Sequence, residues 1–480
     1  MDSIKMTTET QLPQGWKKTT LGEIAIIKMG QSPDSKSYNK QNEGYQLIGG
    51  ASDLGDKFPE PKQFTSEATK LSKINDIIIC IRATIGRLNL SNKIYCLGRG
   101  VAGIEAHDKI ETKFLWYVLM NSEAYLLKNS TGTTFQQVSS PTLKKLPIVY
   151  PTNKETQQAI VNKIESIFTE IDAGIVSLKT AQQQLKHYRQ SLLKNAFNGE
   201  LTKQWRLENT DRLPSANELL AQIQTAREQH HAEQLADWQT AVKQWEQTCK
   251  QGKKPSKPSA LKTLEPISKL NEIELTELPN NWFWERLGLI TLGVEYGTSA
   301  KSQSEGKVPV LRMGNMQNGK IDWTDLVYSN NDEEIEQYLL KKGDVLFNRT
   351  NSPELVGKTS IIETDEKAIF AGYLIRINHL TDIVDGRYLT YFLNSIVAKN
   401  YGNFVKTDGV NQSNINGQKL MNYPFVFCSL AEQTQIVAIL ENKLTACDQL
   451  ACELATQLKQ AELLKQAVLK SAFSGSLLDK

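Results

Sequence analysis

An internal duplication limits this chain to folds that are built from two similar units. Residues 12–24 read LPQGWKKTTLGEI, and residues 278–290 read LPNNWFWERLGLI. The leucine–proline pair, the tryptophan and the leucine–glycine pair keep the same spacing, 266 residues apart. Self-similarity at a fixed offset is typical of a structural unit that occurs more than once in a chain.

A second match closes each copy. Residues 191–201 read SLLKNAFNGEL and residues 467–477 read AVLKSAFSGSL, and these two stretches lie 276 residues apart. This offset holds without a gap back to Thr156 and Glu432. The change from one offset to the other falls in the middle of each copy, where the sequences differ most. A duplicated frame around a divergent centre indicates one scaffold that carries two different readers.

The first part of each copy has the pattern of a mixed domain. Short apolar runs alternate with clusters of Gly, Pro, Asn and Ser, and the runs Ile77–Ile81 and Val345–Phe347 predict buried strands. Residues 114–119 and 388–393 predict short helices. Trp16 and Trp282 are expected to be core residues that anchor the first strand of each domain.

The second part of each copy predicts a long helix. Apolar residues recur every seven positions, at Ile164, Ile171, Leu178, Leu185 and Leu192, and again at Leu440, Cys447, Leu454, Ala461 and Val468. Intervening seam positions are assigned to Ile167, Ala181, Tyr188, Leu450 and Leu464. A seven-residue stripe sustained over about four repeats predicts a coiled-coil seam, and the two stripes have the right length to pair with each other. Gly199 and Gly475 lie where the helices are expected to end.

Composition places few restrictions on function. The length of 480 residues predicts two to four domains, and the net charge of +3 requires that any basic surface be local. The six cysteines form no C-x-x-C pair, which favours reduced thiols in the cytoplasm. We expect no signal peptide at the N-terminus and no membrane-spanning segment, since no apolar run approaches about eighteen residues.

Motifs for catalysis are incomplete in this sequence. Residues 314–321 (GNMQNGKI) resemble a phosphate-binding loop but have Ile321 where a Ser or Thr is needed, and residues 352–359 lack its first glycine. Pro61 argues against a nuclease site at Glu60 and Lys62, because proline disrupts the strand that would present them. These glycines are better explained by turns between strands. We therefore expect no catalytic centre in this chain.

The ordered set of motifs resembles the specificity subunit of type I restriction–modification enzymes. It comprises the L-P-x-x-W and L-G frame, the divergent centre, the helix start Q-x-x-I-V and the helix end L-K-x-A-F-x-G-x-L, over residues 12–477. One departure is that Thr156-Gln157 stands where the second copy has Glu432-Gln433, which would shift the first helix start by a residue at most.

The resemblance implies an α+β fold with an internal pseudo-twofold repeat. Two globular, mixed α/β target-recognition domains would be separated by two long antiparallel coiled-coil helices. The recognition domains are expected at residues 12–150 and 278–427, and the conserved spacer helices at residues 151–200 and 428–477. A polar helical segment and a linker, residues 201–277, would join the copies, with residues 250–259 as its flexible part.

The resemblance also implies the function and the partners. The chain would read a bipartite site on double-stranded DNA, one half per domain, and direct two methyltransferase subunits that modify adenine N6. Two restriction and translocase subunits would complete the assembly. S-adenosylmethionine, ATP and Mg²⁺ are expected on those partners, and no cofactor or metal on this chain. A helix of some forty residues rises on the order of 60 Å, which would let the helices set the unread gap between the half-sites.

Polar side chains in two matched loops of each copy are the candidate base readers, because Arg, Lys, Asn and Gln can specify bases. The first loop follows the predicted buried strand, and the second is rich in amides, at residues 133–137 and 409–414. The candidate DNA-contacting residues are Arg82, Thr84, Arg87, Gln136 and Gln137 in the first copy, and Arg349, Thr350, Asn351, Lys358, Gln412 and Asn414 in the second. The alternative to DNA contact for each arginine is a solvated or salt-bridged surface residue.

A hypothesis from another class is a coiled-coil scaffold whose globular parts bind proteins and have no DNA specificity. The matched basic and amide-rich loops favour DNA over this alternative. A single-chain enzyme that includes its own methyltransferase is a third hypothesis, and we expect no methyl transfer by this chain alone.

Overall fold

The computed structural model describes residues 12–132, 136–247, 254–261, 267, 270 and 274–478. The chain divides into two compact units. Unit 1 comprises residues 1–181 and 453–480, and unit 2 comprises residues 182–452. Each unit therefore combines one globular domain with a part of each of two long helices.

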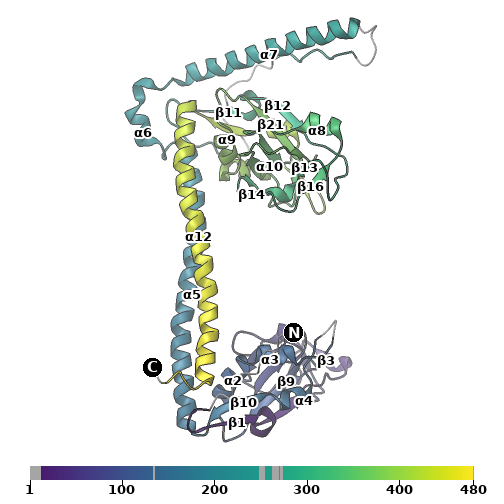
Figure 1. Cartoon of the computed structure of the whole chain (residues 1–480), viewed down its shortest axis with the longest axis vertical. Helices are drawn as coiled ribbons and strands as arrows, with labels where there is room; N and C mark the ends of the chain where they lie inside the picture. The colour runs from purple at the N-terminus through teal and green to yellow at the C-terminus, as the bar shows by residue number, and fades with distance from the viewer. Residues whose placement is uncertain are drawn as a thin grey trace, which may run out of the picture. The chain divides into compact units, whose positions relative to one another are not determined.

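The long helices are α5 (Lys154–Phe197) and α12 (Leu430–Phe473), each of 44 residues. They lie side by side, as Figure 1 shows. In unit 1, Asp172 of α5 forms an ion pair with Lys465 of α12. In unit 2, Arg189 of α5 donates to Asp448 of α12 at 2.6 Å. Each ion pair joins an early part of one helix to a late part of the other, so the helices run antiparallel.

The seven-residue stripe lies along the helix pair. Its buried members are Ile164, Ile171, Leu192, Leu440, Cys447, Leu454 and Val468, whereas Leu178, Leu185 and Ala461 are half-buried. The assignment of Tyr188, Leu450 and Leu464 to the seam is wrong, because 47%, 46% and 52% of these side chains are exposed.

The intervening seam positions lie four residues after the stripe positions, one later than expected. Phe168, Ile175, Leu444 and Leu458 occupy such positions and are half-buried. Two others are the charged residues Arg189 and Lys465, which form the ion pairs with the facing helix. Their long apolar stems cover the seam while their charged ends reach the carboxylates, so polarity hid these positions in the sequence.

The domain of unit 1 is built on a four-stranded antiparallel sheet in the order β2-β9-β6-β7. These strands are β2 (Ala25–Met29), β9 (Val101–Ala106), β6 (Ile77–Cys80) and β7 (Leu88–Leu90). A second sheet, β3-β5-β4-β8, comprises β3 (Tyr38–Asn39), β5 (Phe64–Thr65), β4 (Tyr45–Ile48) and β8 (Cys96–Leu97). The remaining elements are β1 (Trp16–Thr20), which pairs with β10 (Pro147–Pro151), and α1 (Leu21–Ile24), α2 (Thr112–Met120), α3 (Glu123–Lys128) and α4 (Ser140–Lys144).

The domain of unit 2 repeats this plan. Its main sheet has the order β12-β21-β17-β19, with β12 (Thr291–Tyr296), β21 (Leu374–His379), β17 (Val345–Asn348) and β19 (Thr359–Ile361). The second sheet comprises β16 (Val327–Ser329), β13 (Val308–Leu311) and β20 (Ile369–Phe370), and β11 (Phe283–Arg286) pairs with β24 (Pro424–Phe427). Two smaller sheets contain β14 (Met316–Gln317) and β15 (Lys320–Ile321), and β18 (Thr350–Asn351), β23 (Ser413–Asn414) and β22 (Thr407–Asp408). The helices are α8 (Asp332–Tyr338), α9 (Gly386–Leu393), α10 (Ile396–Val405) and α11 (Gly417–Met421).

The two predicted buried strands are β6 and β17, and they occupy the same inner place in their sheets. Every residue of both strands is buried. Ile77 pairs with Ile104 in unit 1, and Val345 pairs with Ile377 in unit 2. Strands covered on both faces have continuous apolar runs, which is why the sequence pattern was clear here. The pairing makes Ile77 structurally equivalent to Val345.

One buried glutamine joins each domain to the start of its long helix. The Gln157 side chain accepts from the Glu111 N–H at 2.7 Å and donates to the Lys109 and Pro151 carbonyls at 3.2 and 2.9 Å. In unit 2, Gln433 accepts from the Asp385 N–H at 2.9 Å and donates to the Ile383 and Cys428 carbonyls at 2.9 and 2.8 Å. Both glutamines are fully buried.

A second contact joins each domain to the end of the other long helix. Gly475 follows α12 with φ +85°, and a Cβ atom there would collide with the ring of Pro13. Gly199 follows α5 with φ +84°, and a Cβ atom there would collide with the ring of Pro279. The two repeated patterns of the sequence, L-P-x-x-W and A-F-x-G-x-L, are therefore the two sides of one contact in each unit.

The first copy has Thr156 where the second copy has Glu432. This difference does not shift the start of the helix, but it changes a buried polar network. Helices α5 and α12 begin at equivalent residues, Lys154 and Leu430. Glu432 is fully buried and accepts from the Trp282 indole at 2.8 Å, the Arg206 guanidinium at 2.8 Å and the Thr202 hydroxyl at 2.9 Å. Trp282 is accordingly buried, whereas Trp16 is only half-buried in unit 1.

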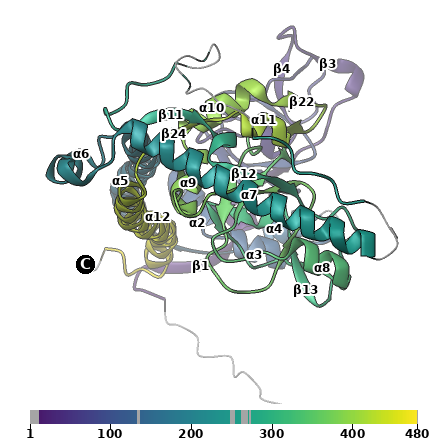
Figure 2. The ribbon, with the colours of Figure 1, turned by 90° about the horizontal axis from the view of Figure 1, so that it is seen from above.

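Residues 201–277 contribute α6 (Lys203–Glu208) and the 32-residue helix α7 (Ala216–Gln247), which runs along the upper side of the domain of unit 2 in Figure 1 and passes across it in Figure 2. Leu219 and Ile223 of α7 belong to the main core of that unit. The expectation of a flexible linker at residues 250–259 stays a prediction; the structure describes this segment from residue 254 on and assigns no helix or strand to it. Trp238 of α7 donates to the Pro255 carbonyl at 3.1 Å, and Lys257 lies over the Trp238 ring at 5.8 Å.

We predict that Gln157→Ala and Gln433→Ala each destabilise the protein. Each change leaves one backbone N–H and two carbonyl groups buried without their partner, which costs about 2–4 kcal/mol of unfolding free energy. Urea unfolding of each variant measures the loss. Gln158→Ala is the matched control, because this neighbouring amide is exposed and donates to the Asn162 side chain one helical turn away. Equal stability of Q157A and Q158A would contradict the role of the buried amide.

Stability should also depend on pH through Glu285, a fully buried residue of β11. Burial raises the pKa of its carboxyl to about 7, against the Arg286 N–H and the charge of Arg227, which lower it. Because the folded state holds this proton more tightly, the contribution of Glu285 is fully present below its unfolded pKa and is lost as pH rises through about 7. Urea unfolding at pH 5 and pH 8 should show a smaller decrease for Glu285→Gln than for the unmodified chain.

Candidate nucleic-acid interface

The hairpin loop after the buried strand is built in the same way in both domains. In unit 1 the Gly86 N–H donates to the Cys80 carbonyl at 3.0 Å, and the Cys80 N–H donates to Arg87 at 2.8 Å. In unit 2 the Gly357 N–H donates to Asn348 at 2.8 Å, and the Asn348 N–H donates to Lys358 at 2.8 Å. Arg87 and Lys358 are therefore structurally equivalent, although the loop of unit 2 is longer.

The amide-rich loop lies directly beside this hairpin loop in each domain. The Val138 N–H donates to the Ile81 carbonyl at 2.9 Å, and Arg82 pairs with Gln137 as an antiparallel bridge. In unit 2 the Ile415 N–H donates to the Arg349 carbonyl at 2.9 Å, and Thr350 pairs with Asn414. Two loops that are far apart in the sequence thus form one surface in each domain.

This register shifts the two arginines by one position. Arg82 is equivalent to Thr350, and Arg349 is equivalent to the buried Ile81. Because side chains alternate along an extended strand, Arg82 and Arg349 point to opposite sides. Arg82 is exposed, whereas Arg349 is half-buried with its guanidinium over the Tyr296 ring at 4.8 Å. The sequence placed both after the same strand, but of these two arginines Arg82 is the exposed one.

Arg87 has a structural contact of its own. Its guanidinium donates to three backbone carbonyls, those of Ala51 at 3.2 Å, Leu54 at 2.6 Å and Gly55 at 3.4 Å. These bonds tie the hairpin to the segment that connects β4 and β5 of the second sheet. Arg87 therefore fits a supporting role better than base contact.

The remaining candidates divide by exposure. Thr84, Gln136, Gln137 and Gln412 are exposed, and Thr350, Asn351, Lys358 and Asn414 are half-buried. The Asn414 amide donates to the Thr350 hydroxyl at 2.7 Å, which joins the two loops of unit 2. Residues 407–414 and Thr350 line an open cavity of about 600 Å³, with the fully exposed Val410 at the tip of the hairpin. Residues 133–135 of the first amide-rich loop lie outside the described residues.

Helix α10 contributes basic residues that the sequence analysis missed. Lys406, at its end, donates to the Pro353 carbonyl of the hairpin loop at 3.2 Å. Lys419 donates to the Thr407 hydroxyl of the amide-rich hairpin at 2.7 Å. Lys399 lies on α10 itself. The position of Lys399 and Lys406 beside the loops comes from the helix pair α9–α10, and their only sequence signal was that they follow the short helix predicted at residues 388–393. Lys419 lies on α11.

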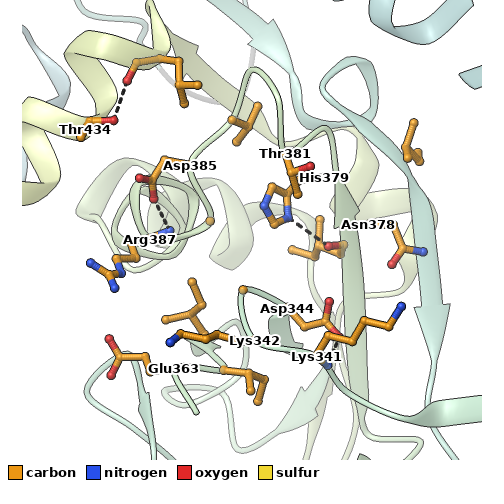
Figure 3. Close-up of a pocket in the computed structure, with 18 of the residues that line it drawn as sticks. Lys341, Lys342, Asp344, Glu363, Asn378, His379, Thr381, Asp385, Arg387 and Thr434 are labelled. Carbon is orange, nitrogen blue, oxygen red and sulfur yellow. Dashed lines mark hydrogen bonds between the residues drawn. The ribbon is translucent and has the colours of Figure 1, made fainter. Parts of the chain in front are cut away.

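A second cavity of unit 2, of about 910 Å³, lies at the opposite end of strand β17 (Figure 3). Lys341, Lys342 and Arg387 line it together with Asp344, Glu363 and Asp385. Burial lowers the pKa of His379 in its wall. The charges that line it are of both signs, and the Asp385 carboxylate caps α9 by accepting from the Arg387 and Tyr388 N–H groups. No group of three or more His, Cys, Asp or Glu side chains that could hold a metal occurs among the described residues.

The near-miss phosphate loop has a simple structural role. Residues 314–321 form a turn and the hairpin β14–β15, and Gly319 has φ +82°. This agrees with turn glycines rather than a nucleotide cradle. None of the helices in the described parts of the chain is long and apolar enough to span a membrane.

Comparison with known proteins gives the family. The model described as "Type I restriction modification DNA specificity domain" matches residues 13–185 and 296–460, more than half of the chain. The EcoKI specificity subunit of Escherichia coli is 22% identical over 97% of this chain and 90% of its own length. The EcoEI specificity subunit of E. coli is 26% identical, over 96% and 83%. A putative MjaX specificity subunit of Methanocaldococcus jannaschii is 28% identical, and there the match covers 42% of this chain and 46% of the relative.

Two solved structures share the fold. A chain described in work on complex assembly and conformational transition of the type I R-M system has a TM-score of 0.66, 18% identity and coverage of 98% of this chain and 100% of its own. The HsdS subunit from Thermoanaerobacter tengcongensis has a TM-score of 0.51, 17% identity and coverage of 97% and 98%. The expected fold class is confirmed. The chain belongs to the specificity-subunit family of type I restriction–modification systems.

Proposed function

We propose that this chain is the non-catalytic subunit that reads a bipartite DNA target, with one half-site read by each domain. The observation that carries this proposal is the pair of matched surfaces. In each domain the hairpin loop and the amide-rich loop meet through the same backbone bonds, yet equivalent positions carry different side chains. Arg82 and Gln137 in unit 1 correspond to Thr350 and Asn414 in unit 2. One scaffold with two sets of readers suits two different half-sites.

The exposed side chains have the chemistry of base recognition. Arginine can bind the O6 and N7 atoms of guanine, and an amide can bind the N6 and N7 atoms of adenine. Unit 1 presents Arg82, Gln136 and Gln137 for this purpose, and unit 2 presents Gln412, with Asn414 and Thr350 joined to each other. Such polar groups need no catalytic partner to act, in agreement with a subunit that recognises DNA and leaves chemistry to others.

The chain would deliver partner subunits to this site. We propose that two methyltransferase subunits, which hold S-adenosylmethionine, dock on the long helices outside the seam. Two restriction and translocase subunits, with ATP and Mg²⁺, would join them, and this chain would bind no cofactor. Exposed apolar side chains at equivalent positions support two similar docking surfaces: Tyr188 on α5 and Leu464 on α12 are 47% and 52% exposed. Exposed apolar side chains can mark protein–protein interaction sites, where a partner would bury them.

We predict that two arginines of the same hairpin have different roles, one in DNA binding and the other in stability. Arg82→Ala should weaken binding to the cognate duplex by about 1–3 kcal/mol and relax methylation at one half-site, because it removes a base contact. Its Tm should not change, since Arg82 is exposed. Arg87→Ala should lower Tm, because three backbone carbonyls lose their donor. Binding by the complex with its methyltransferase, together with thermal unfolding, separates the two roles. The assignment fails if R82A binds and methylates like the unmodified chain.

Exchange of a whole domain tests the two-reader proposal. Replacing residues 12–150 by the corresponding domain of another family member should change only one half of the methylated sequence. A change in both halves would overturn it.

A binding assay tests the DNA partner separately. Log affinity for DNA should fall linearly with log salt concentration, because phosphate contacts release counterions. DNA affinity that does not change with salt concentration would favour a protein-binding scaffold instead.

A further inference from the structure

The amide-rich loop of unit 2 is a two-stranded ribbon with a tight turn at its tip. Its strands, β22 and β23, pair in antiparallel register. The Gly409 N–H donates to the Gln412 carbonyl at 2.7 Å, so Val410 and Asn411 are the two central residues of the turn. A two-stranded ribbon is narrow enough to enter the major groove of B-DNA.

Contacts at the base of the ribbon fix its position on the domain. The Asn414 amide donates to the Thr350 hydroxyl at 2.7 Å. The Lys419 ammonium donates to the Thr407 hydroxyl at 2.7 Å. The residue that follows the ribbon, Ile415, is fully buried in the main core of unit 2. The turn is therefore carried on a stem that is anchored on both strands.

Val410, in the turn, is not packed into the fold. Its side chain is fully exposed, whereas the next most exposed large apolar side chain among the described residues, that of Leu207, is 66% exposed. Tight turns favour Gly, Asn, Asp, Ser and Pro, so the turn itself does not call for a valine. An apolar side chain gains free energy only when it leaves water, and for Val410 this can happen only when a partner binds.

The surroundings of Val410 favour DNA as that partner. It lines the open cavity of about 600 Å³ that also contains Gln412, Asn414 and Thr350, which we propose as readers of the second half-site. In an A·T pair, the N6 and N7 atoms of adenine and the 5-methyl group of thymine lie on the same major-groove edge. An apolar side chain beside amides matches this edge, because the amide can bind adenine while the apolar group meets the methyl.

The negative charge of the ribbon is compensated. Asp408 is the only acidic residue in the sequence from 407 to 414. Its carboxylate accepts from the Ser413 hydroxyl and lies 4.0 Å from the Lys406 ammonium. Lys419 adds a second positive charge beside β22. The ribbon can therefore approach the phosphates that border the groove without net repulsion.

We propose that the β22–β23 ribbon enters the major groove at the second half-site, where Val410 contacts the 5-methyl group of one thymine. This inference rests on the proposed DNA-reading function and adds a specificity-determining residue to it. The contact would favour thymine over cytosine, which lacks the methyl group, at a position that the polar readers do not distinguish by hydrogen bonds alone.

The test combines one variant of the protein with one change in the DNA. The complex with the methyltransferase is titrated with a duplex that carries the methylated target of the host, in which each thymine is replaced in turn by uracil. Uracil pairs with adenine in the same way and lacks only the 5-methyl group. At the contacted position, uracil should weaken binding by the unmodified complex about 4-fold, the value for one buried methyl group. Val410→Ala should weaken binding to the thymine duplex by about the same factor.

The two losses should not add, because both remove the same contact. With V410A, uracil at the contacted position should have no further effect, and uracil at any other position should act as it does on the unmodified complex. Leu207→Ala is the matched control, since this exposed apolar residue lies on α6 and does not line the cavity of the ribbon. It should keep the full response to uracil at every position.

Losses from V410A and from uracil that add at every position would overturn the contact. A weaker affinity of V410A for the methyltransferase in the absence of DNA would also overturn it and would assign Val410 to a protein interface. Tm should not change in V410A, and a lower Tm would indicate a structural role instead. If the unmodified complex binds the target no better than a shuffled duplex, the proposed function itself fails, which is a separate outcome.

Discussion

Each domain depends on one buried glutamine amide that fixes it to the start of a long helix. Gln157 and Gln433 satisfy one N–H and two carbonyl groups apiece in a site without access to water. Buried backbone groups left unpaired are costly, so the domain has one stable position on its helix. The Pro13–Gly475 and Pro279–Gly199 contacts add a second attachment to the other helix. The repeated frame of the sequence is the set of residues that makes these attachments.

Fixed attachments leave the centre of each domain free to differ. The hairpin and the amide-rich loop are joined by the same backbone bonds in both units, and these bonds do not depend on side-chain identity. Arg82 can therefore stand where the other unit has Thr350, and Arg87 where it has Lys358. The two surfaces carry different side chains at these positions, which would suit the two different half-sites that we propose for this chain.

Much of the architecture could be predicted because it rests on repeated local patterns. The offset duplication, the apolar runs of β6 and β17 and the seven-residue stripe all follow from burial. The seam positions Arg189 and Lys465 escaped prediction, since charged residues with apolar stems do not look like core. The shift between Arg82 and Arg349 needed the hydrogen-bond register of β17. The tie of Arg87 to three carbonyls joins segments far apart in sequence, and no local pattern reports such a contact.

The most direct measurement of the central claim is a map of N6-methyladenine across the genome of a host that expresses this chain with its methyltransferase. Two different readers on one repeated scaffold predict an asymmetric motif of two short specified halves, each with a methylated adenine, around a gap of fixed length and free sequence. A single uninterrupted motif, or methylation that does not change when this chain is removed, would contradict the account.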